Sequence, residues 1–405
     1  MMIFGMKTKF LREAILIIFA AMIAWLIITS FSSIVFLPGA DEGCYLRYTK
    51  EVLDKGLPAF KDLLVTYIAD SNYWGFPVPV RCGFIICGAF FCRLFGFSFI
   101  SIAFLSLFSF FCAVFFTYWL SRKVFGRDVA FLAGLFFLSS PLALALSRRA
   151  LSDSASNFLL LTAVLWQIDY FTSGCRRWKK WSLAAVLLLA LAFRETNILF
   201  IFPLAVSSLA FLPEKGFRQL IKSWVVIYAV PVGAIFIIYK FLFGNIADIF
   251  KALFFLPSAG SHSYVLQFQS GPWFRYLIDF ILVSPWVMIL GIYYILYVLI
   301  HKTKKEDLAL ALFIIFTIFT FSFFSKNLRY VSVIDYPLRI FTAMAILSVH
   351  SVRSKYSAFT FALAVVMLIC VMELVNFIRI FVWAGVYDPV SFGLLSFWNI
   401  IPHFN

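Results

Sequence analysis

Long runs of apolar residues constrain this chain more than any other feature of its sequence. Such runs occur, for example, at residues 14–36, 184–193 and 309–324. A helix needs roughly 20 apolar residues to cross a bilayer, whereas the strands of a membrane barrel read as alternating segments of about 10 residues. We find no such alternation, and 63% of the 405 residues are hydrophobic against 13% that are charged. The sequence therefore predicts an all-α polytopic membrane protein whose surroundings are the lipid bilayer.

The basic residues cluster in short gaps between the apolar runs. The chain has 34 Lys and Arg residues against 19 Asp and Glu residues, a formal net charge of +15. Six clusters lie near residues 7–12, 122–127, 176–180, 215–222, 302–305 and 353–355. Because cytoplasmic loops of membrane proteins are enriched in Lys and Arg, the excess charge needs no nucleic-acid partner. We predict a multi-pass protein of the cytoplasmic membrane with a cytoplasmic N-terminus.

Placing all six clusters on the cytoplasmic side predicts eleven transmembrane helices. They lie near residues 14–36, 98–120, 130–147, 155–172, 181–196, 197–212, 223–243, 273–300, 308–324, 331–349 and 357–380. We therefore expect a transmembrane domain at residues 1–380 and a short outer tail at 381–405. The apolar stretch 79–96 is interrupted by Arg81, Gly83, Gly88 and Arg93, and counting it as a span would reverse every later loop. We interpret it as a re-entrant or interfacial helix within a long outer loop, residues 37–97.

Carboxylates and arginines gather on the predicted outer face, and ionisable residues near a membrane tend to be functional. The pair Asp41-Glu42 follows the first span directly and could supply a general base, a metal ligand or a solvated loop. Arg148 and Arg149 oppose the positive-inside bias, and guanidinium groups suit bidentate phosphate binding. Asp153 could cap the helix that follows it or join the same site.

Further polar residues are predicted on the same face. Arg194-Glu195 ends a short apolar helix, where an ion pair is the plain alternative to a binding role. Arg329-Tyr330 opens a late helix, and His262 lies in the outer segment 244–272 as a candidate substrate contact or a surface residue. The cysteines show no metal-ligand spacing, and we predict neither a metal nor a cofactor. Together these residues suit a substrate with an anionic head and a long apolar tail, because carboxylates can activate a hydroxyl and arginines can stabilise a departing phosphate.

The order of these motifs resembles the C-type (GT-C) glycosyltransferase superfamily, especially protein O-mannosyltransferases and lipid A aminoarabinose transferases. The resemblance covers roughly residues 10–350. It rests on the acidic pair at 41–42, the long outer loop, the basic Phe-Gly turn at 121–127, Leu-Ser-Asp-Ser at 151–154, and the pairs at 194–195 and 329–330. Ser152 stands where the family usually has Pro. The Pro expected soon after Tyr330 is missing, although Pro337 follows later.

The resemblance implies transfer of a sugar from a polyprenyl-phosphate donor to an acceptor hydroxyl, with inversion at the anomeric carbon. It implies that Asp41 is the base and that Glu42 and Asp153 orient the acceptor or a supporting ion. The implied donor-phosphate residues are Arg148, Arg149, Arg194, Arg329 and Tyr330; the implied further contacts are Glu195 and His262. A lipid-linked glycan polymerase or ligase, and a lipid flippase or transporter, are the alternatives. The residues do not indicate which sugar is moved, or whether a protein, lipid or glycan accepts it.

Overall fold

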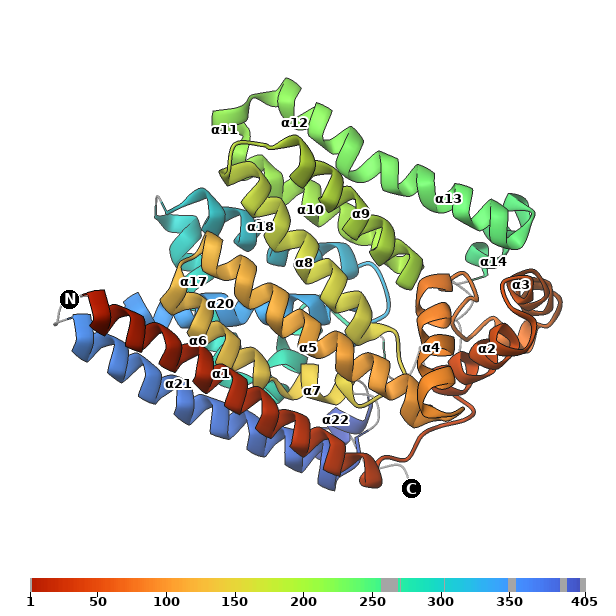
Figure 1. The fold of residues 1–405 in the computed structure, drawn as a ribbon, viewed down its shortest axis with the longest axis horizontal. Coiled ribbons are helices and arrows are strands. Elements are labelled where there is room, and N and C mark those ends of the chain that lie inside the picture. The colour runs from red at the N-terminus through yellow and green to blue at the C-terminus, as the bar shows by residue number, and fades with distance from the viewer. Residues whose placement is uncertain are drawn as a thin grey trace.

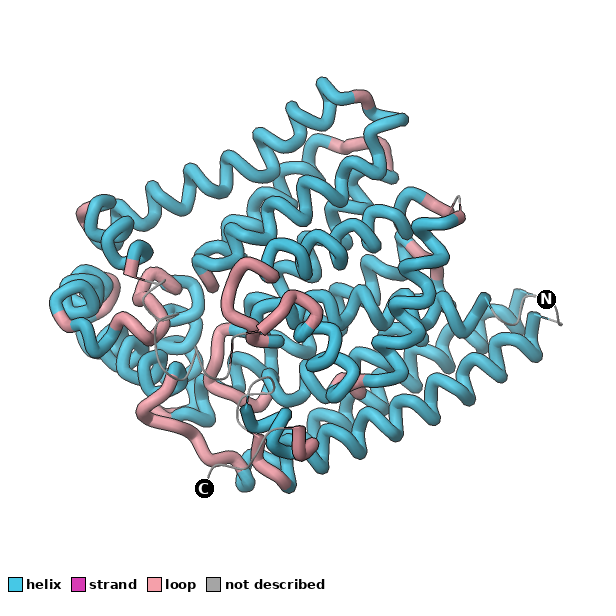
Figure 2. Tube along the Cα trace, turned by 180° about the vertical axis from the view of Figure 1, so that it is seen from behind, coloured by secondary structure: helices cyan, strands magenta, loops and turns pink. Residues whose placement is uncertain are grey.

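A computed structural model of the chain describes residues 2–255, 269, 271–301, 303–348, 355–386 and 392–400. Throughout these residues the regular structure is helical, and they contain no strand, which confirms the all-α prediction (Figure 1). Seen from behind in Figure 2, most loops lie toward one end of the helical bundle.

The helices follow one another with few long connections. In chain order they are α1 (Met2–Ser30), α2 (Asp41–Lys55), α3 (Ala59–Ala69), α4 (Cys82–Phe95), α5 (Phe99–Val124), α6 (Arg127–Leu138), α7 (Pro141–Ser147), α8 (Asp153–Thr172), α9 (Arg177–Phe193), α10 (Ile201–Ser208), α11 (Leu212–Lys215), α12 (Phe217–Trp224), α13 (Val230–Phe243), α14 (Ile246–Phe254), α16 (Arg275–Val283), α17 (Pro285–Ile300), α18 (Lys305–Phe321), α19 (Leu328–Val331), α20 (Asp335–Ser348), α21 (Lys355–Phe377) and α22 (Phe392–Phe397). Short 3-10 or π segments extend several of them: η1 (Phe31–Ser33), η3 (Glu195–Phe200), η4 (Leu209–Phe211), η5 (Val225–Ala229), η7 (Ser332–Ile334) and η8 (Ile378–Trp383), while η2 (Ser71–Tyr73) follows α3.

Six helical segments of the described chain are long and apolar enough to cross a membrane. They are Leu11–Ser33, Phe99–Val124, Glu195–Lys215, Phe217–Phe243, Leu328–Ser348 and Phe359–Trp383. The pair α6 and α7, bent by 57° at residues 139–140, makes a seventh if it is one span. The other four predicted spans correspond to α8, α9, α16 with α17, and α18, which are helices that fall outside these criteria. The structure thus confirms a multi-pass helical protein, and the number eleven stays a prediction.

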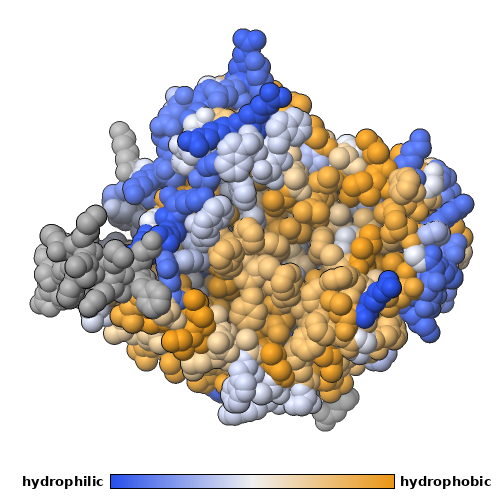
Figure 3. All heavy atoms as spheres, in the orientation of Figure 1, coloured by the Kyte–Doolittle hydropathy of each residue, from blue (hydrophilic) through white to orange (hydrophobic). Residues whose placement is uncertain are grey.

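The core of the bundle is built around α20. The segment Leu328–Ser348 is the most buried of the six spans, and α20 packs against α6 and α17 while α5 packs along α8. Large apolar side chains nevertheless point away from the core, among them Trp25, Phe115 and Phe241, which are 70%, 63% and 81% exposed. Figure 3 shows the resulting apolar belt between two hydrophilic rims. Such a belt suits contact with lipid and not with water.

Several of the predicted cytoplasmic basic clusters lie at the same end of the bundle. The N-terminus, α11 and α12 lie at one end, opposite α2, α3 and α4 (Figure 1). Ion pairs join Arg12 to Asp128 and Lys305 to Glu214 at this first end, and Arg122 Nη1 lies 3.0 Å from Glu13 Oε1. Basic clusters that are distant in sequence therefore meet at one end, as expected if they share one side of the membrane.

Helix α4 lies across the opposite end of the bundle. Its 14 residues span roughly 21 Å at 1.5 Å per residue, less than the roughly 30 Å of a hydrocarbon core. It packs against α2, α5 and α9 and crosses the ends of α5 and α9 in Figure 1. Its length and position agree with the interfacial or re-entrant interpretation of residues 79–96.

The described part of the predicted tail is attached to the bundle. The expected boundary at residue 380 falls inside η8, and Phe381, Val386 and Leu394 are buried in the main apolar core. Residues 381–386 therefore form one wall of the bundle at the α2–α4 end.

Candidate functional site

Three carboxylates lie at the α2–α4 end and differ in exposure. Asp41 and Glu42 occupy the first turn of α2, and Asp153 opens α8; acidic side chains are favoured at helix N-termini by the exposed N–H groups there. The Asp41 side chain is 30% exposed, whereas those of Glu42 and Asp153 are 0% and 1% exposed. Of the three, Asp41 is the carboxylate that a substrate can reach.

Arg329 connects Asp41 to Asp153. Its Nη2 lies 3.0 Å from Asp41 Oδ2 and 3.1 Å from Asp153 Oδ2. The other oxygen of Asp153 accepts a hydrogen bond from Arg194 Nη1 at 2.7 Å, and the Arg194 guanidinium lies 5.4 Å from the centre of the Tyr330 ring. Side chains from α2, α8, α19 and the residue between α9 and η3 therefore meet in one ion cluster.

Glu42 is held away from solvent by backbone groups. Its Oε2 accepts from the Leu37 N–H at 3.1 Å and its Oε1 from the Ala150 N–H at 3.2 Å. Arg149 Nη1 lies 3.6 Å from Oε2. Burial raises the pKa of Glu42, while the charge of Arg149 and the two N–H groups act in the opposite direction. Glu42 thus joins the linker before α2 to the loop before α8.

A second ion pair lies beside the cluster. Arg81, which precedes α4, donates from Nε and Nη2 to the two carboxylate oxygens of Glu195 at 2.7 and 2.6 Å. Its Nη1 donates to the Tyr45 hydroxyl, which is itself 2.9 Å from Ser152 Oγ. Sequence reasoning noted Arg81 only as a break in an apolar stretch. A buried cation in that stretch, with the acid of Glu195 predicted on the same face, is the signal that could have indicated the pair.

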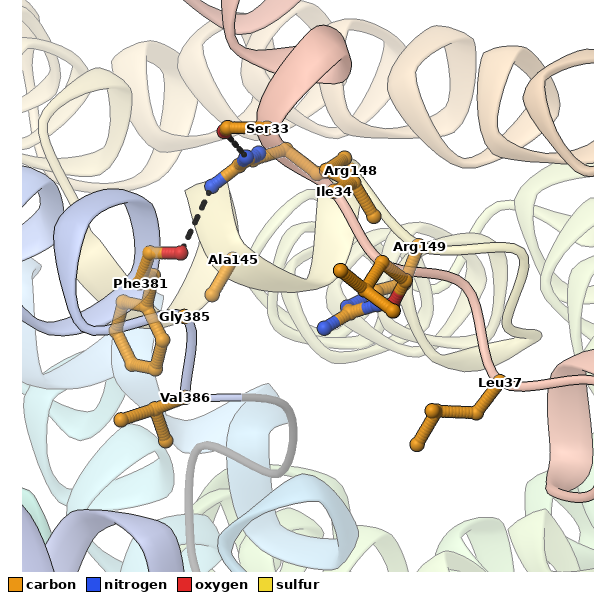
Figure 4. Close-up of a pocket in the computed structure, with 10 residues that line it drawn as sticks. Ser33, Ile34, Leu37, Ala145, Arg148, Arg149, Phe381, Gly385 and Val386 are labelled. Atoms are coloured by element: carbon orange, nitrogen blue, oxygen red, sulfur yellow. Dashed lines mark hydrogen bonds between the residues drawn. The ribbon is translucent and has the colours of Figure 1, made fainter.

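Arg148 and Arg149 line a cavity of about 150 Å³. The cavity is enclosed by residues 33–37 after α1, by the end of α7 and by residues 381–386 (Figure 4). Because whole ligands usually occupy 300–1,000 Å³, this space suits a small head group.

The two arginines behave differently within this cavity. Arg148 is committed to the wall: it donates to the carbonyl oxygens of Ser30 at 2.8 Å and Phe381 at 3.2 Å. Burial and the neighbouring Arg149 charge lower the pKa of Arg148 to about 10. Arg149 donates to the Val35 carbonyl at 2.9 Å and reaches toward the middle of the cavity in Figure 4.

The structure therefore brings together most of the predicted site residues. Asp41, Asp153, Arg194, Arg329 and Tyr330 share one cluster, and Glu42 links it to Arg149. His262 lies outside the described residues. Within the part of the chain that is described, no three His, Cys, Asp or Glu side chains form a group that could hold a metal ion.

Comparison with known proteins identifies the class to which this fold belongs. The structure is similar to that of ArnT from Cupriavidus metallidurans bound to undecaprenyl phosphate, with a TM-score of 0.58 and 15% identity over 95% of this chain and 75% of that one. It is also similar to an oligosaccharyltransferase of Archaeoglobus fulgidus in its apo form, with a TM-score of 0.66 and 14% identity over 91% of this chain and 56% of that one. The archaeal oligosaccharyltransferase AglB from Archaeoglobus fulgidus, in complex with an inhibitory peptide and a dolichol-phosphate, matches with a TM-score of 0.61 and 14% identity over 91% of this chain and 56% of that one. The chain thus has the GT-C fold, that of a polytopic all-α membrane protein.

The comparison with sequence families also indicates a glycosyltransferase-like chain. Residues 79–243 match the family of dolichyl-phosphate-mannose-protein mannosyltransferases, a stretch that includes α4 and extends to the end of α13. No curated protein sequence matches the chain. The predicted resemblance to the GT-C superfamily, with its mannosyltransferases and aminoarabinose transferases, is confirmed, and both the family and the structural neighbours are glycosyltransferases. The chain spans only 56% of the oligosaccharyltransferase to which it is similar.

Proposed function

We propose that this protein is a membrane glycosyltransferase that moves a sugar from a polyprenyl-phosphate donor to an acceptor hydroxyl, with inversion. One observation carries the proposal. The partly exposed carboxylate of Asp41 is ion-paired with Arg329 at one end of an apolar bundle, where four further arginines lie: Arg81, Arg148, Arg149 and Arg194. A proton acceptor and groups able to bind phosphate are thus neighbours, as the transfer requires.

In this mechanism Asp41 is the base. Its carboxylate takes the proton of the acceptor hydroxyl while the acceptor oxygen forms a bond to the anomeric carbon of the sugar. The bond from that carbon to the phosphate oxygen breaks on the opposite face, and its electron pair stays on the polyprenyl phosphate. Guanidinium groups near the departing oxygen stabilise the charge that develops there.

The position of each predicted site residue suggests which role it has. Arg149 points into the cavity and Arg329 lies beside Asp41, so we assign the donor phosphate to these two residues first. Arg194, whose guanidinium lies near Tyr330, keeps Asp153 and hence Arg329 in position. Glu42 and Asp153 are buried, and we assign them to orienting the loops and arginines around the substrates. Arg148 supports the cavity wall, and Glu195 holds Arg81 in position beside the ion cluster. His262 remains a predicted contact of the acceptor or donor.

The apolar belt suits contact with the long tail of the donor. The complexes of two structural neighbours, which contain undecaprenyl phosphate and dolichol-phosphate, also support a polyprenyl-phosphate donor. We place the site on the outer face and the N-terminus in the cytoplasm, because the positive-inside rule assigns the basic end to the cytoplasm. Residues 1–380 then form the catalytic domain, with 381–405 as an outer tail. The identities of the sugar and of the acceptor lie beyond this proposal.

The test is transfer in reconstituted vesicles. Purified protein is mixed with radiolabelled polyprenyl-phosphate sugars and a crude envelope acceptor fraction, with Asp41→Asn as control. Label that moves to an acceptor with wild type and stays on the lipid with the variant supports the proposal. Label that crosses the bilayer while staying on its lipid identifies a flippase. Growth of a lipid-linked glycan identifies a polymerase.

A further inference from the structure

A second group of charges lies in the core of the bundle, away from the residues used by the mechanism. Arg339 and Asp335 belong to α20, and Glu373 belongs to α21. Arg339 is 0% exposed, Asp335 2% and Glu373 1%. Ionisable side chains at such positions are rare inside membrane proteins and are functional by default.

The three charges are bound tightly to one another. Arg339 Nε lies 3.0 Å from Asp335 Oδ2, and its Nη2 lies 2.8 Å from Glu373 Oε2. Ser284, between α16 and α17, donates to Glu373 Oε2 at 2.8 Å. We call Asp335, Arg339 and Glu373 the core triad.

The triad also fixes the bend between α6 and α7. Ser140 Oγ, at the bend, donates to Asp335 Oδ2 at 2.6 Å, and Arg339 Nη1 donates to the Phe136 carbonyl at 2.8 Å. The short helix α7 that begins after this bend ends at Ser147, immediately before Arg148 and Arg149. The direction in which α7 leaves the bend therefore decides where these two arginines lie.

The same triad touches the segments that carry the rest of the site. Glu373 lies eight residues before Phe381 on the continuous helix Phe359–Trp383, and the Phe381 carbonyl accepts from Arg148 in the cavity wall. Asp335 follows Arg329 by six residues, through η7, where Ser332 exchanges hydrogen bonds with Asn157 of α8. The triad thus joins α20 and α21 to the bend before α7. Each of these three segments leads to a residue of the cavity or of the ion cluster.

We propose that the core triad positions the site, with Arg339 as the central positioning residue. It holds Arg149 and Arg329 at a fixed separation without touching substrate. If the three charges only stabilised the fold, apolar residues could replace them, because well-packed apolar residues are often as stable as a buried ion pair. What apolar packing does not supply is a set of directed bonds to three separate segments, and that is what Arg339 provides.

The first test does not depend on the proposed function. Hydrogen exchange of the full-length protein in detergent is compared for wild type, Glu373→Gln and Asp169→Asn. Asp169 forms a buried pair with Lys179 at 2.5 Å near the junction of α8 and α9 and serves as the matched control. We expect Glu373→Gln to raise exchange at residues 145–150, 328–334 and 378–386, and Asp169→Asn to leave these segments unchanged. Equal exchange in wild type and Glu373→Gln, or the same increase in both variants, overturns the inference.

The second test rests on the proposed function through its ligand. Binding of undecaprenyl phosphate to the same proteins should weaken about tenfold in Glu373→Gln, within the range by which mutations alter coupling between sites, and should be unaffected in Asp169→Asn. If wild type binds no undecaprenyl phosphate, the donor assignment fails while the exchange result still decides the inference. Should Glu373→Gln not fold, Ser284→Ala removes one hydrogen bond to Glu373 and repeats both measurements with a smaller expected change.

Discussion

Replacing Asp41 by Asn tests the proposed base at nearly constant shape. Asn cannot take up the acceptor proton, and a positioned general base contributes about 10²- to 10⁴-fold to a rate. The expected loss in turnover corresponds to roughly 3 to 5 kcal/mol of transition-state stabilisation.

The structure predicts that this loss comes without unfolding. Asp41 is 30% exposed and contacts Arg329 at 3.0 Å, and partly exposed pairs of this kind contribute about 1 kcal/mol or less. Arg329 keeps Asp153 at 3.1 Å, so the variant does not leave its guanidinium without a carboxylate. Thermal unfolding in detergent should therefore be close to that of the wild type.

The neighbouring residue provides the contrast. Both oxygens of Glu42 accept backbone N–H groups, so Glu42→Gln must turn an NH₂ group toward one of these donors. Leaving a buried donor unsatisfied costs about 1–3 kcal/mol, and the variant should unfold at a lower temperature. The assay is turnover of labelled donor lipid together with thermal unfolding for both variants. Near-normal turnover in Asp41→Asn would refute the assignment of the base, and unfolding of Asp41→Asn as early as Glu42→Gln would refute the exposure reasoning.

Further predictions concern the arginines and metal dependence. Arg149→Ala should weaken binding of undecaprenyl phosphate, measured as a higher Kd. Turnover at saturating donor should fall less, because the side chain faces the cavity and not Asp41. An unchanged Kd would show that Arg149 does not bind the donor phosphate. Arg81→Met should destabilise the protein by about 3–5 kcal/mol, because it leaves Glu195 as an uncompensated buried charge. The double variant Arg81→Met with Glu195→Leu should recover much of the melting temperature, and a failure to recover would mean that Arg81 acts mainly through Tyr45. Chelation with EDTA should leave transfer unchanged, because the proposed mechanism uses guanidinium groups for charge stabilisation. The oxygens of Glu42 and Asp153 also already accept hydrogen bonds. Activity that is lost with EDTA and restored by added divalent ions would contradict this prediction.

Sequence reasoning reached the class of fold because hydropathy and basic loops report on the membrane directly. Apolar runs located the helices, and the basic clusters grouped loops that the structure places at one end. The number of crossings is harder to predict, as α9 shows: it has only 17 residues and stays a predicted span. The bend between α6 and α7 was not predicted, since residues 130–147 were interpreted as one span.

The residues of the site could be predicted from the sequence, but the contacts between them could not. Asp41, Asp153, Arg194 and Arg329 were each indicated by charge on the expected face. That Arg329 joins Asp41 to Asp153, across 288 and 176 residues of sequence, follows from tertiary packing that a local pattern does not contain. The pair Arg81 and Glu195 was missed for the same reason, because only half of it had been singled out as a site residue. Glu42, adjacent to Asp41 in sequence, accepts hydrogen bonds from two backbone N–H groups and lies beside Arg149, and neither contact follows from a local pattern.

The ion pair between Asp41 and Arg329 has a consequence for the order in which substrates engage. While Arg329 is bound to Asp41, one oxygen of the carboxylate is held in the ion pair at 3.0 Å. A donor phosphate that attracts Arg329 would loosen this pair and free the carboxylate only once the sugar is in place. Without a donor, the base would then stay in its ion pair, and an acceptor hydroxyl would be activated only after the donor has bound.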